Sequence, residues 1–178
     1  PDEPRYRHAE LVDGELVLVS PPTWLHQHVM TRLVAAFVMW CAAAPGRGEI
    51  TVDPPVRITN LRAYLPDVAW YRDGRGRPAA GRPYLAGPPD LAIEVLSPST
   101  RTVDMIRKRT DYARVGVREL WLIDPEEPAA FVLRAPDPAM EPAEFVLVEE
   151  LAADGELTSP MLPGLAVRLG DVVPEREA

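Results

Sequence analysis

Hydrophobic and polar residues alternate near the start of the chain in a pattern that predicts a β-hairpin and then an amphipathic helix. Residues Glu10–Ser20 alternate around Asp13-Gly14, a pair typical of a two-residue hairpin turn. Thr23 is a good helix N-cap, and apolar residues then recur at helical spacing as far as Pro45-Gly46. The recurring positions, which predict one buried helix face, are Leu25, Val29, Leu33, Phe37 and Trp40.

The middle of the chain predicts several strands and a second helix. Short strand candidates lie at Glu49–Val52, Val56–Thr59 and Asp67–Tyr71, and a loop rich in Gly, Pro and Arg follows from Arg72 to Pro89. Leu91–Leu96 is almost wholly apolar, as expected of a strand buried on both faces of a sheet. A helix capped by Thr100 or Thr102 is predicted to end at Gly116.

The last third of the chain predicts further strands. Glu119–Ile123 is apolar, Phe131–Arg134 and Glu144–Val148 form a second hairpin pattern, and Leu162 to Val173 adds at most one strand. The sequence shows no internal repeat and no domain linker. We therefore expect one α/β domain over residues 1–178, with a mixed sheet flanked by helices and an N-terminal β-hairpin.

The apolar runs, the cysteine count and the net charge limit the classes of protein to which the chain can belong. No apolar run is long enough to span a bilayer, and the start of the chain lacks the pattern of a signal peptide. Cys41 is the single cysteine, so an intrachain disulfide is excluded and a cytoplasmic protein with no membrane association is expected. The net charge of −8 gives no general attraction to nucleic acid, unless a bound cation reverses the sign locally.

Glu94 is the first candidate for chemistry, because its neighbours in the apolar strand are all hydrophobic. A lone carboxylate there costs several kcal/mol by desolvation, so it must be paired, protonated or bound to a metal. The alternative is an edge strand that turns Glu94 to solvent. Asp67 follows Pro66 at the start of another predicted strand, and two convergent carboxylates with waters are a common way to hold Mg²⁺.

Lys108 is the only lysine in a chain that otherwise uses arginine for positive charge. On the predicted helix it shares a stripe with Asp104 and Tyr112, while Val103, Ile106, Ala113 and Val117 mark the expected buried side. Lys108 is therefore either half of an exposed pair with Asp104 or an ammonium placed against a metal site. Only a lysine, not an arginine, suits the second role.

Histidine and arginine residues give weaker signals. The spacing of His26 and His28 does not suit a two-histidine metal clamp on a helix, but one of them can approach the site. Ser97 to Thr100 lacks the pattern of a nucleophile elbow and is read as a turn and helix cap. The long loop carries a local basic patch, which is either a solvated surface or a set of phosphate contacts: Arg72, Arg75, Arg77 and Arg82.

Four stretches of the chain form a recognisable set of motifs: Pro66-Asp67-Val68, the run from Pro89 to Thr100, Lys108 with Tyr112 and Gly116-Val117, and Trp121 to Pro125. Together they resemble the Uma-type family of restriction endonucleases, within the PD-(D/E)XK nuclease superfamily. The resemblance also takes in the N-terminal hairpin, His26-Gln27 and Leu162 to Leu165. It implies a restriction-endonuclease-like fold, Mg²⁺- or Mn²⁺-dependent phosphodiester hydrolysis, and Asp67 and Glu94 as the two acids.

The chain departs from the superfamily pattern at Leu96, where a lysine normally stands two positions after the second acid. The resemblance implies that Lys108 takes this role, that a carbonyl near Val95 helps Asp67 and Glu94 to hold the metal, and that His26 and Tyr112 are accessory. Our leading hypothesis is an endonuclease that acts on nucleic acid, with DNA favoured, and forms a homodimer. The alternative is a catalytically silent nuclease-fold module that binds a partner or assembles as a homodimer.

Overall fold

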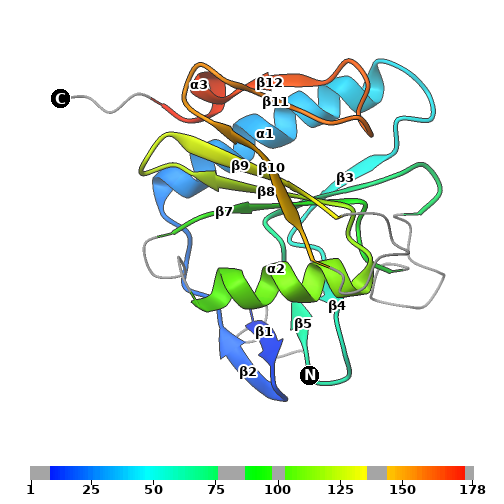
Figure 1. Cartoon of the computed structure of the whole chain (residues 1–178), viewed down its shortest axis with the longest axis vertical. Helices are drawn as coiled ribbons and strands as arrows, with labels where there is room; N and C mark the ends of the chain where they lie inside the picture. The colour runs from blue at the N-terminus through cyan, green and yellow to red at the C-terminus, as the bar shows by residue number, and fades with distance from the viewer. Residues whose placement is uncertain (1–8, 76–86, 98–102, 136–143, 175–178) are drawn as a thin grey trace.

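The computed structural model describes residues 9–75, 87–97, 103–135 and 144–174. Two long helices, α1 (Trp24–Ala42) and α2 (Val103–Val115), lie on either side of a central sheet (Figure 1). Within the described residues, neither of these helices, nor the short α3 (Leu169–Val172), is long and apolar enough to cross a membrane.

The central sheet has six strands in the order β10-β9-β8-β7-β6-β3. Its members are β3 (Glu49–Val52), β6 (Val68–Tyr71), β7 (Leu91–Val95), β8 (Glu119–Asp124), β9 (Ala129–Arg134) and β10 (Val146–Leu151). Strands β7 and β8 are parallel because α2 connects them, and every other neighbouring pair in this sheet is antiparallel. The expected mixed sheet flanked by helices is therefore confirmed.

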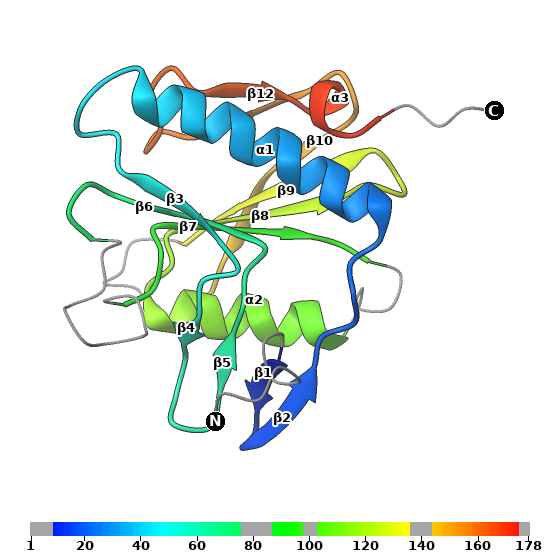
Figure 2. The same ribbon diagram turned by 180° about the vertical axis from the view of Figure 1, so that it is seen from behind.

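A second, smaller sheet extends below α2 and has the order β2-β1-β5-β4 (Figure 2). It consists of β1 (Ala9–Val12), β2 (Glu15–Leu18), β4 (Val56–Arg57) and β5 (Ala63–Tyr64). Asp13 and Gly14 both have positive φ, as a two-residue hairpin turn of this hand requires, so the N-terminal hairpin is confirmed. A third sheet pairs β11 (Glu156–Thr158) with β12 (Ala166–Arg168).

Two groups of buried side chains hold the layers together, one on each face of the central sheet. Leu33, Phe37 and Trp40 of α1 pack against Ile93 and Trp121, and the third sheet and α3 cover the far side of α1. On the opposite face, Tyr112 and Ala113 of α2 pack against Ala92 and Leu120. Successive residues of a strand point to opposite faces, so Glu94 lies on the α2 side together with Ala92.

Most predicted elements are present, with three corrections. Val56–Thr59 is shortened to β4 because a turn at Thr59 leads into β5, which the sequence pattern did not predict. The tail from Leu162 to Val173, for which at most one strand was predicted, contains the strand β12 and the helix α3, which was not predicted. Strand β11 lies before this tail. Ile106 was predicted to be buried, yet 66% of its surface is exposed. Thr100, Thr102, Arg77 and Arg82 lie outside the described residues.

Candidate active site

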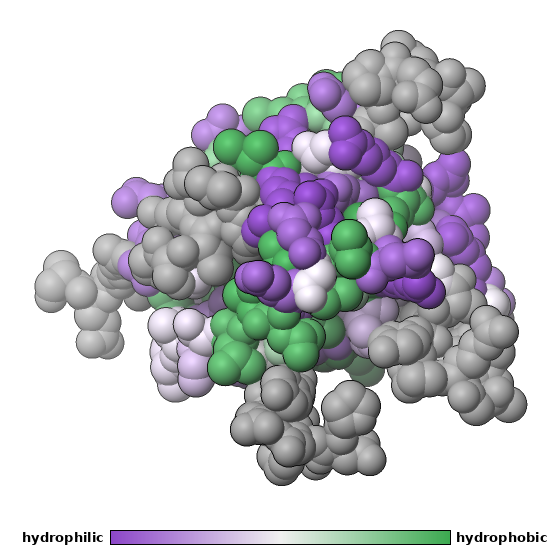
Figure 3. Space-filling view, turned by 90° about the horizontal axis from the view of Figure 1, so that it is seen from below, coloured by the Kyte–Doolittle hydropathy of each residue, from purple (hydrophilic) through white to green (hydrophobic). Residues whose placement is uncertain are grey.

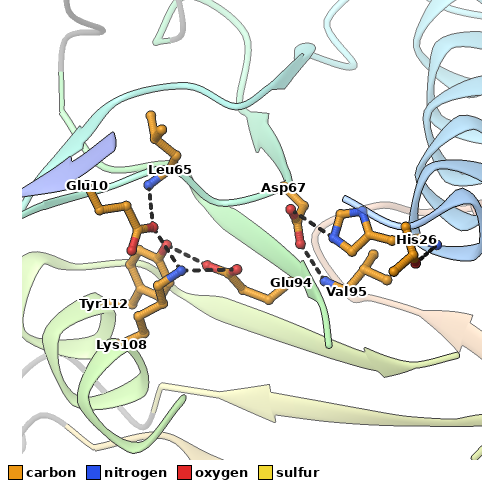
Figure 4. A network of polar contacts seen from close by, with 9 residues as sticks. Glu10, His26, Leu65, Asp67, Glu94, Val95, Lys108 and Tyr112 are labelled. Atoms are coloured by element: carbon orange, nitrogen blue, oxygen red, sulfur yellow. Dashed lines mark hydrogen bonds and ion pairs between the residues drawn. The ribbon is translucent and has the colours of Figure 1, made fainter. Parts of the chain in front are cut away.

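Asp67 directly precedes β6, and Glu94 lies in the neighbouring β7 at the same end of the sheet. In the antiparallel β6–β7 pair, Val68 is the partner of Ile93, so Asp67 and Glu94 stand opposite each other one step further along. Their side chains point in different directions (Figure 4): Asp67 points toward His26 and Val95, and Glu94 points toward Lys108 and Tyr112. The backbone N–H of Val95 donates a 2.7 Å hydrogen bond to Oδ2 of Asp67, which fixes this carboxylate beside the end of β7.

Glu94 is buried in β7, where all five residues are buried, so the alternative of an exposed edge position is wrong. Its side chain points toward α2 (Figure 4). Tyr112 donates a 2.7 Å hydrogen bond to Oε1, and Nζ of Lys108 lies 3.5 Å from Oε2. One helix therefore supplies both a neutral donor and a cation to this carboxylate.

Lys108 contacts a second carboxylate, which comes from the N-terminal hairpin. Its Nζ lies 2.9 Å from Oε1 of Glu10, and the side chains of both residues are only 8% exposed. The same Oε1 accepts a hydrogen bond from the backbone N–H of Leu65. The reading of Lys108 as an exposed surface lysine is therefore wrong, and Lys108 and Tyr112 of α2 face the molecule's interior.

His26, in the first turn of α1, supports Asp67 from the other side. Its Nε2 lies 3.2 Å from Oδ1 of Asp67, and Thr23 caps the helix by accepting a hydrogen bond from the His26 backbone N–H. His28 instead stacks on Trp24, so only one of the two histidines reaches the site. Burial lowers the pKa of His26, but the hydrogen bond and charge of Asp67, with the charges of Glu94 and Asp53, outweigh it and raise the pKa overall.

The site carries more negative than positive charge. Burial is the largest influence on Glu94 and raises its pKa to about 8, although Lys108 and the Tyr112 hydrogen bond act in the opposite direction. The charges of Asp67 and Glu10 raise it further. A cation bound between Asp67 and Glu94 would relieve this repulsion.

The available donors fit a hydrated divalent ion. Among the described residues, no three His, Cys, Asp or Glu side chains are grouped so that they could hold a metal ion. Mg²⁺, however, is commonly held by only one or two carboxylates, and waters and substrate oxygens complete its shell. Asp67 and Glu94 carry such hard oxygen donors at neighbouring positions of the sheet. The contact described for Val95 uses its N–H, and the metal role of its carbonyl stays a prediction.

Two of the arginines predicted to contact phosphate, Arg72 and Arg75, lie at the other end of the β6–β7 pair. Arg72 and Arg75 both form ion pairs with the buried carboxylate of Asp90, at 3.4 and 2.7 Å. Asp67 precedes β6 and Arg72 follows it, so about 16 Å of strand separates them at roughly 3.3 Å per residue. Both guanidinium groups stay nearly half exposed, and their contact with nucleic acid stays a prediction.

Glu10 is the site residue that the sequence reasoning missed. In the sequence, Glu10 looks like an ordinary polar residue of a hairpin strand in which hydrophobic and polar residues alternate. Nothing in its own segment marks it as a site residue. Its burial depends on α2, which is far away in the sequence. Within the sequence, the one available signal was that Lys108, if buried, would need more than one anionic partner.

Comparison with known proteins places the chain in a family. No curated protein matched the chain. A crystal structure described as a putative nuclease of the family DUF820, from Anabaena variabilis, has a similar fold, with a TM-score of 0.75 over 93% of this chain and 89% of that one. The two sequences are 18% identical, so this likeness concerns the fold. The family model described as "Uma2: Putative restriction endonuclease" matches residues 1–170, and the chain therefore belongs to the Uma2 family.

Proposed function

We propose that this protein is a Mg²⁺- or Mn²⁺-dependent endonuclease that hydrolyses phosphodiester bonds of DNA. The observation that carries the proposal is that Asp67 is bound to the backbone of Val95, next to Glu94, with the chain's only lysine packed against Glu94. The family and the fold support a nuclease. The metal and the DNA substrate are inferred from the chemistry of the site.

Asp67 and Glu94 would hold the divalent ion, with help from the carbonyl of Val95. Such an ion, when bound, neutralises charge on a phosphate and makes a water more acidic. His26 fixes the orientation of Asp67 through Nε2, and Tyr112 does the same for Glu94 through its hydroxyl. Each acid therefore has its own supporting side chain, as a preorganised site requires.

Lys108 is proposed to orient the attacking water or steady the charge that develops on the phosphate. Its ammonium is buried and held between two carboxylates, so little side-chain conformational entropy is lost when substrate binds. A flexible exposed lysine would lack this advantage. Nucleic acid must approach a chain of net charge −8, so we propose that the bound cation and the exposed parts of Arg72 and Arg75 supply local attraction.

The test is cleavage of duplex DNA, single-stranded DNA and RNA in Mg²⁺, in Mn²⁺ and in EDTA. We expect cleavage of DNA that needs a divalent ion and is lost in Asp67→Asn. A matched control is Asp73→Asn, which changes a carboxylate at the other end of β6. Metal binding without cleavage of any substrate would instead support the catalytically silent module, and cleavage in EDTA would exclude the proposed mechanism.

We also propose that the chain forms a homodimer through β2, the outer strand of the hairpin. All four residues of β2 are exposed, and Leu16, Leu18 and the following Val19 present 57%, 64% and 45% of their surfaces. Figure 3 looks onto the end of the molecule that carries the hairpin and shows hydrophobic residues gathered among hydrophilic ones. An outer strand also offers unpaired backbone groups to a second strand.

A comparison with β10, one of the two outer strands of the central sheet, favours β2 as the contact. β10 is interrupted by a bulge between Leu147 and Glu149 and carries two adjacent acids, features that block pairing between edges. β2 has regular pairing with β1 and a single charge at Glu15. If two copies of β2 pair antiparallel about Val17, each Glu15 faces a Val19, so like charges do not meet.

A further inference from the structure

Glu10 links the N-terminal hairpin to the candidate active site. It lies on β1, and its Oε1 accepts a hydrogen bond from Leu65 while contacting Nζ of Lys108. The carboxylate and the ammonium are both nearly excluded from solvent. A charge buried to this degree needs a partner, because an unpaired ion in a protein interior is strongly destabilising.

The two anionic partners described for Lys108 are not equivalent. Nζ lies 2.9 Å from Glu10 but 3.5 Å from Glu94, so Glu10 is the nearer of the two. Glu94 is also the carboxylate that the proposed function assigns to the metal. A divalent cation on Glu94 would weaken its attraction for Lys108 and would repel the ammonium.

We infer that Glu10 is a positioning residue that keeps Lys108 in the site while Glu94 is occupied by the divalent ion. The catalytic consequence rests on the proposed function, whereas the contact between Glu10 and Lys108 does not. Without Glu10, the ammonium would lose the nearer of its two described carboxylate partners and would keep the one that holds the cation. With Glu10, it stays buried within reach of the reacting phosphate.

The surrounding structure holds β1 against α2 in a way that suits this role. Arg62 pairs with Asp13 in the hairpin turn and with Asp111 on α2, at 2.6 and 3.2 Å. Tyr64 of β5 donates a 2.7 Å hydrogen bond to the same Asp111, and its ring lies 5.7 Å from Nζ of Lys108. The hairpin is therefore tied to the helix that carries the lysine.

A purely structural role for Glu10 would be to hold the hairpin to Leu65. The substitution Glu10→Gln separates the two roles, because the amide keeps an oxygen that can accept from Leu65 but loses the negative charge that holds Lys108. Glu15→Gln is the matched control, since it makes the same change at an exposed position of the same hairpin.

The readout uses the fact that the sequence contains one lysine. Protein made with ¹³C-labelled lysine gives one set of Cε–Hε signals in NMR, and the two Hε protons have different shifts only while the side chain is fixed. With saturating Mg²⁺, wild type and Glu15→Gln should show two distinct Hε shifts, and Glu10→Gln should show one averaged shift. Distinct shifts in Glu10→Gln equal to those of wild type would overturn the inference.

The catalytic consequence is measured separately. In Glu10→Gln, kcat should fall on the order of 10-fold or more, as expected when a positioned group is displaced, while KM and the Mg²⁺ dissociation constant stay within about twofold. An unchanged kcat would overturn the catalytic part. If wild type cleaves nothing, the proposed function fails, and the NMR comparison still decides whether Glu10 holds Lys108.

A second variant covers the case in which Glu10→Gln does not fold. Adding Lys108→Met removes the ammonium that would be left without its nearer partner, so the double variant should fold and melt near the temperature of Lys108→Met alone. If the double variant also fails to fold while Lys108→Met folds, Glu10 acts on the hairpin and not through Lys108, which would contradict the inference.

Discussion

The hydroxyl of Tyr112 donates a 2.7 Å hydrogen bond to Oε1 of Glu94, and both side chains are buried between α2 and the central sheet. A hydrogen bond to a carboxylate favours its ionised form, and this contact lowers the pKa of Glu94 against the opposing effect of burial. Tyr112 therefore acts on the proposed metal ligand directly.

Tyr112→Phe should weaken divalent metal binding and lower stability. Loss of the hydroxyl raises the pKa of Glu94 further, so a proton competes more strongly with the metal at neutral pH. We expect Mn²⁺ affinity measured by calorimetry at pH 7 to fall roughly 3- to 10-fold, and stability to fall by about 1–3 kcal/mol. Tyr71→Phe is the control, because the buried Tyr71 hydroxyl has no hydrogen-bond partner among the described residues. Equal losses in both variants would contradict a specific role for Tyr112.

Glu94 should make the stability of the metal-free protein depend on pH. Burial raises its folded-state pKa from an ordinary 4.5 to about 8, so the folded protein binds the Glu94 proton more tightly than the unfolded chain does. The stability that this proton contributes is fully present below about pH 4.5 and is lost as pH rises through about 8. In EDTA, the melting temperature of wild type should therefore fall relative to that of Glu94→Gln between about pH 5 and 8. Parallel melting curves across this range would contradict the prediction.

Glu94→Gln should also abolish binding of Mg²⁺ or Mn²⁺ without unfolding the protein. The amide keeps the shape of the side chain but removes the charged oxygen donors, and the loss of a buried charge can raise the melting temperature of the metal-free protein. In wild type, metal binding should release a proton and become tighter as pH rises toward 8 and above. Calorimetry in buffers of different ionisation enthalpy measures both effects. An unchanged metal affinity in Glu94→Gln would make this residue structural.

The sequence predicted the parts of the fold that depend on local pattern. The Asp13-Gly14 turn, the helix that begins after Thr23, and the buried strand around Glu94 each have their own short-range signal, and all three are present. The parallel pairing of β7 with β8 follows from the helix between them.

The missed features depend on tertiary contacts that no local pattern encodes. Helical spacing placed Ile106 inside because it is apolar, but α2 turns Lys108 and Tyr112 inward to meet the carboxylates of the sheet and the hairpin. Glu10 was missed for the same reason. Strand β5 has only two residues, which is too short for an alternating pattern to be recognised.

The homodimer proposal predicts that a charge placed on β2 dissociates the protein. Wild type should sediment as a dimer at micromolar concentration, and Val17→Lys should raise the dimer dissociation constant at least roughly 10-fold, because two lysines would meet at the centre of the proposed antiparallel pair. Leu147→Lys introduces the same change on β10 and should leave the dimer intact. A monomeric wild type, or dissociation by Leu147→Lys alone, would contradict β2 as the contact.

The central claim is that Asp67, Glu94 and Lys108 form a catalytic centre, and Lys108→Arg tests it most directly. Arginine keeps the positive charge and is a good helix former, so a lysine with only an ion-pairing role should be replaced with little effect. The guanidinium is bulkier and does not give up its proton, so it cannot take the place of an ammonium held between Glu10 and Glu94. The measurement is the single-turnover rate of DNA cleavage at saturating Mg²⁺. We predict a fall on the order of 10²-fold or more with metal affinity retained, whereas a wild-type rate in Lys108→Arg would contradict the account.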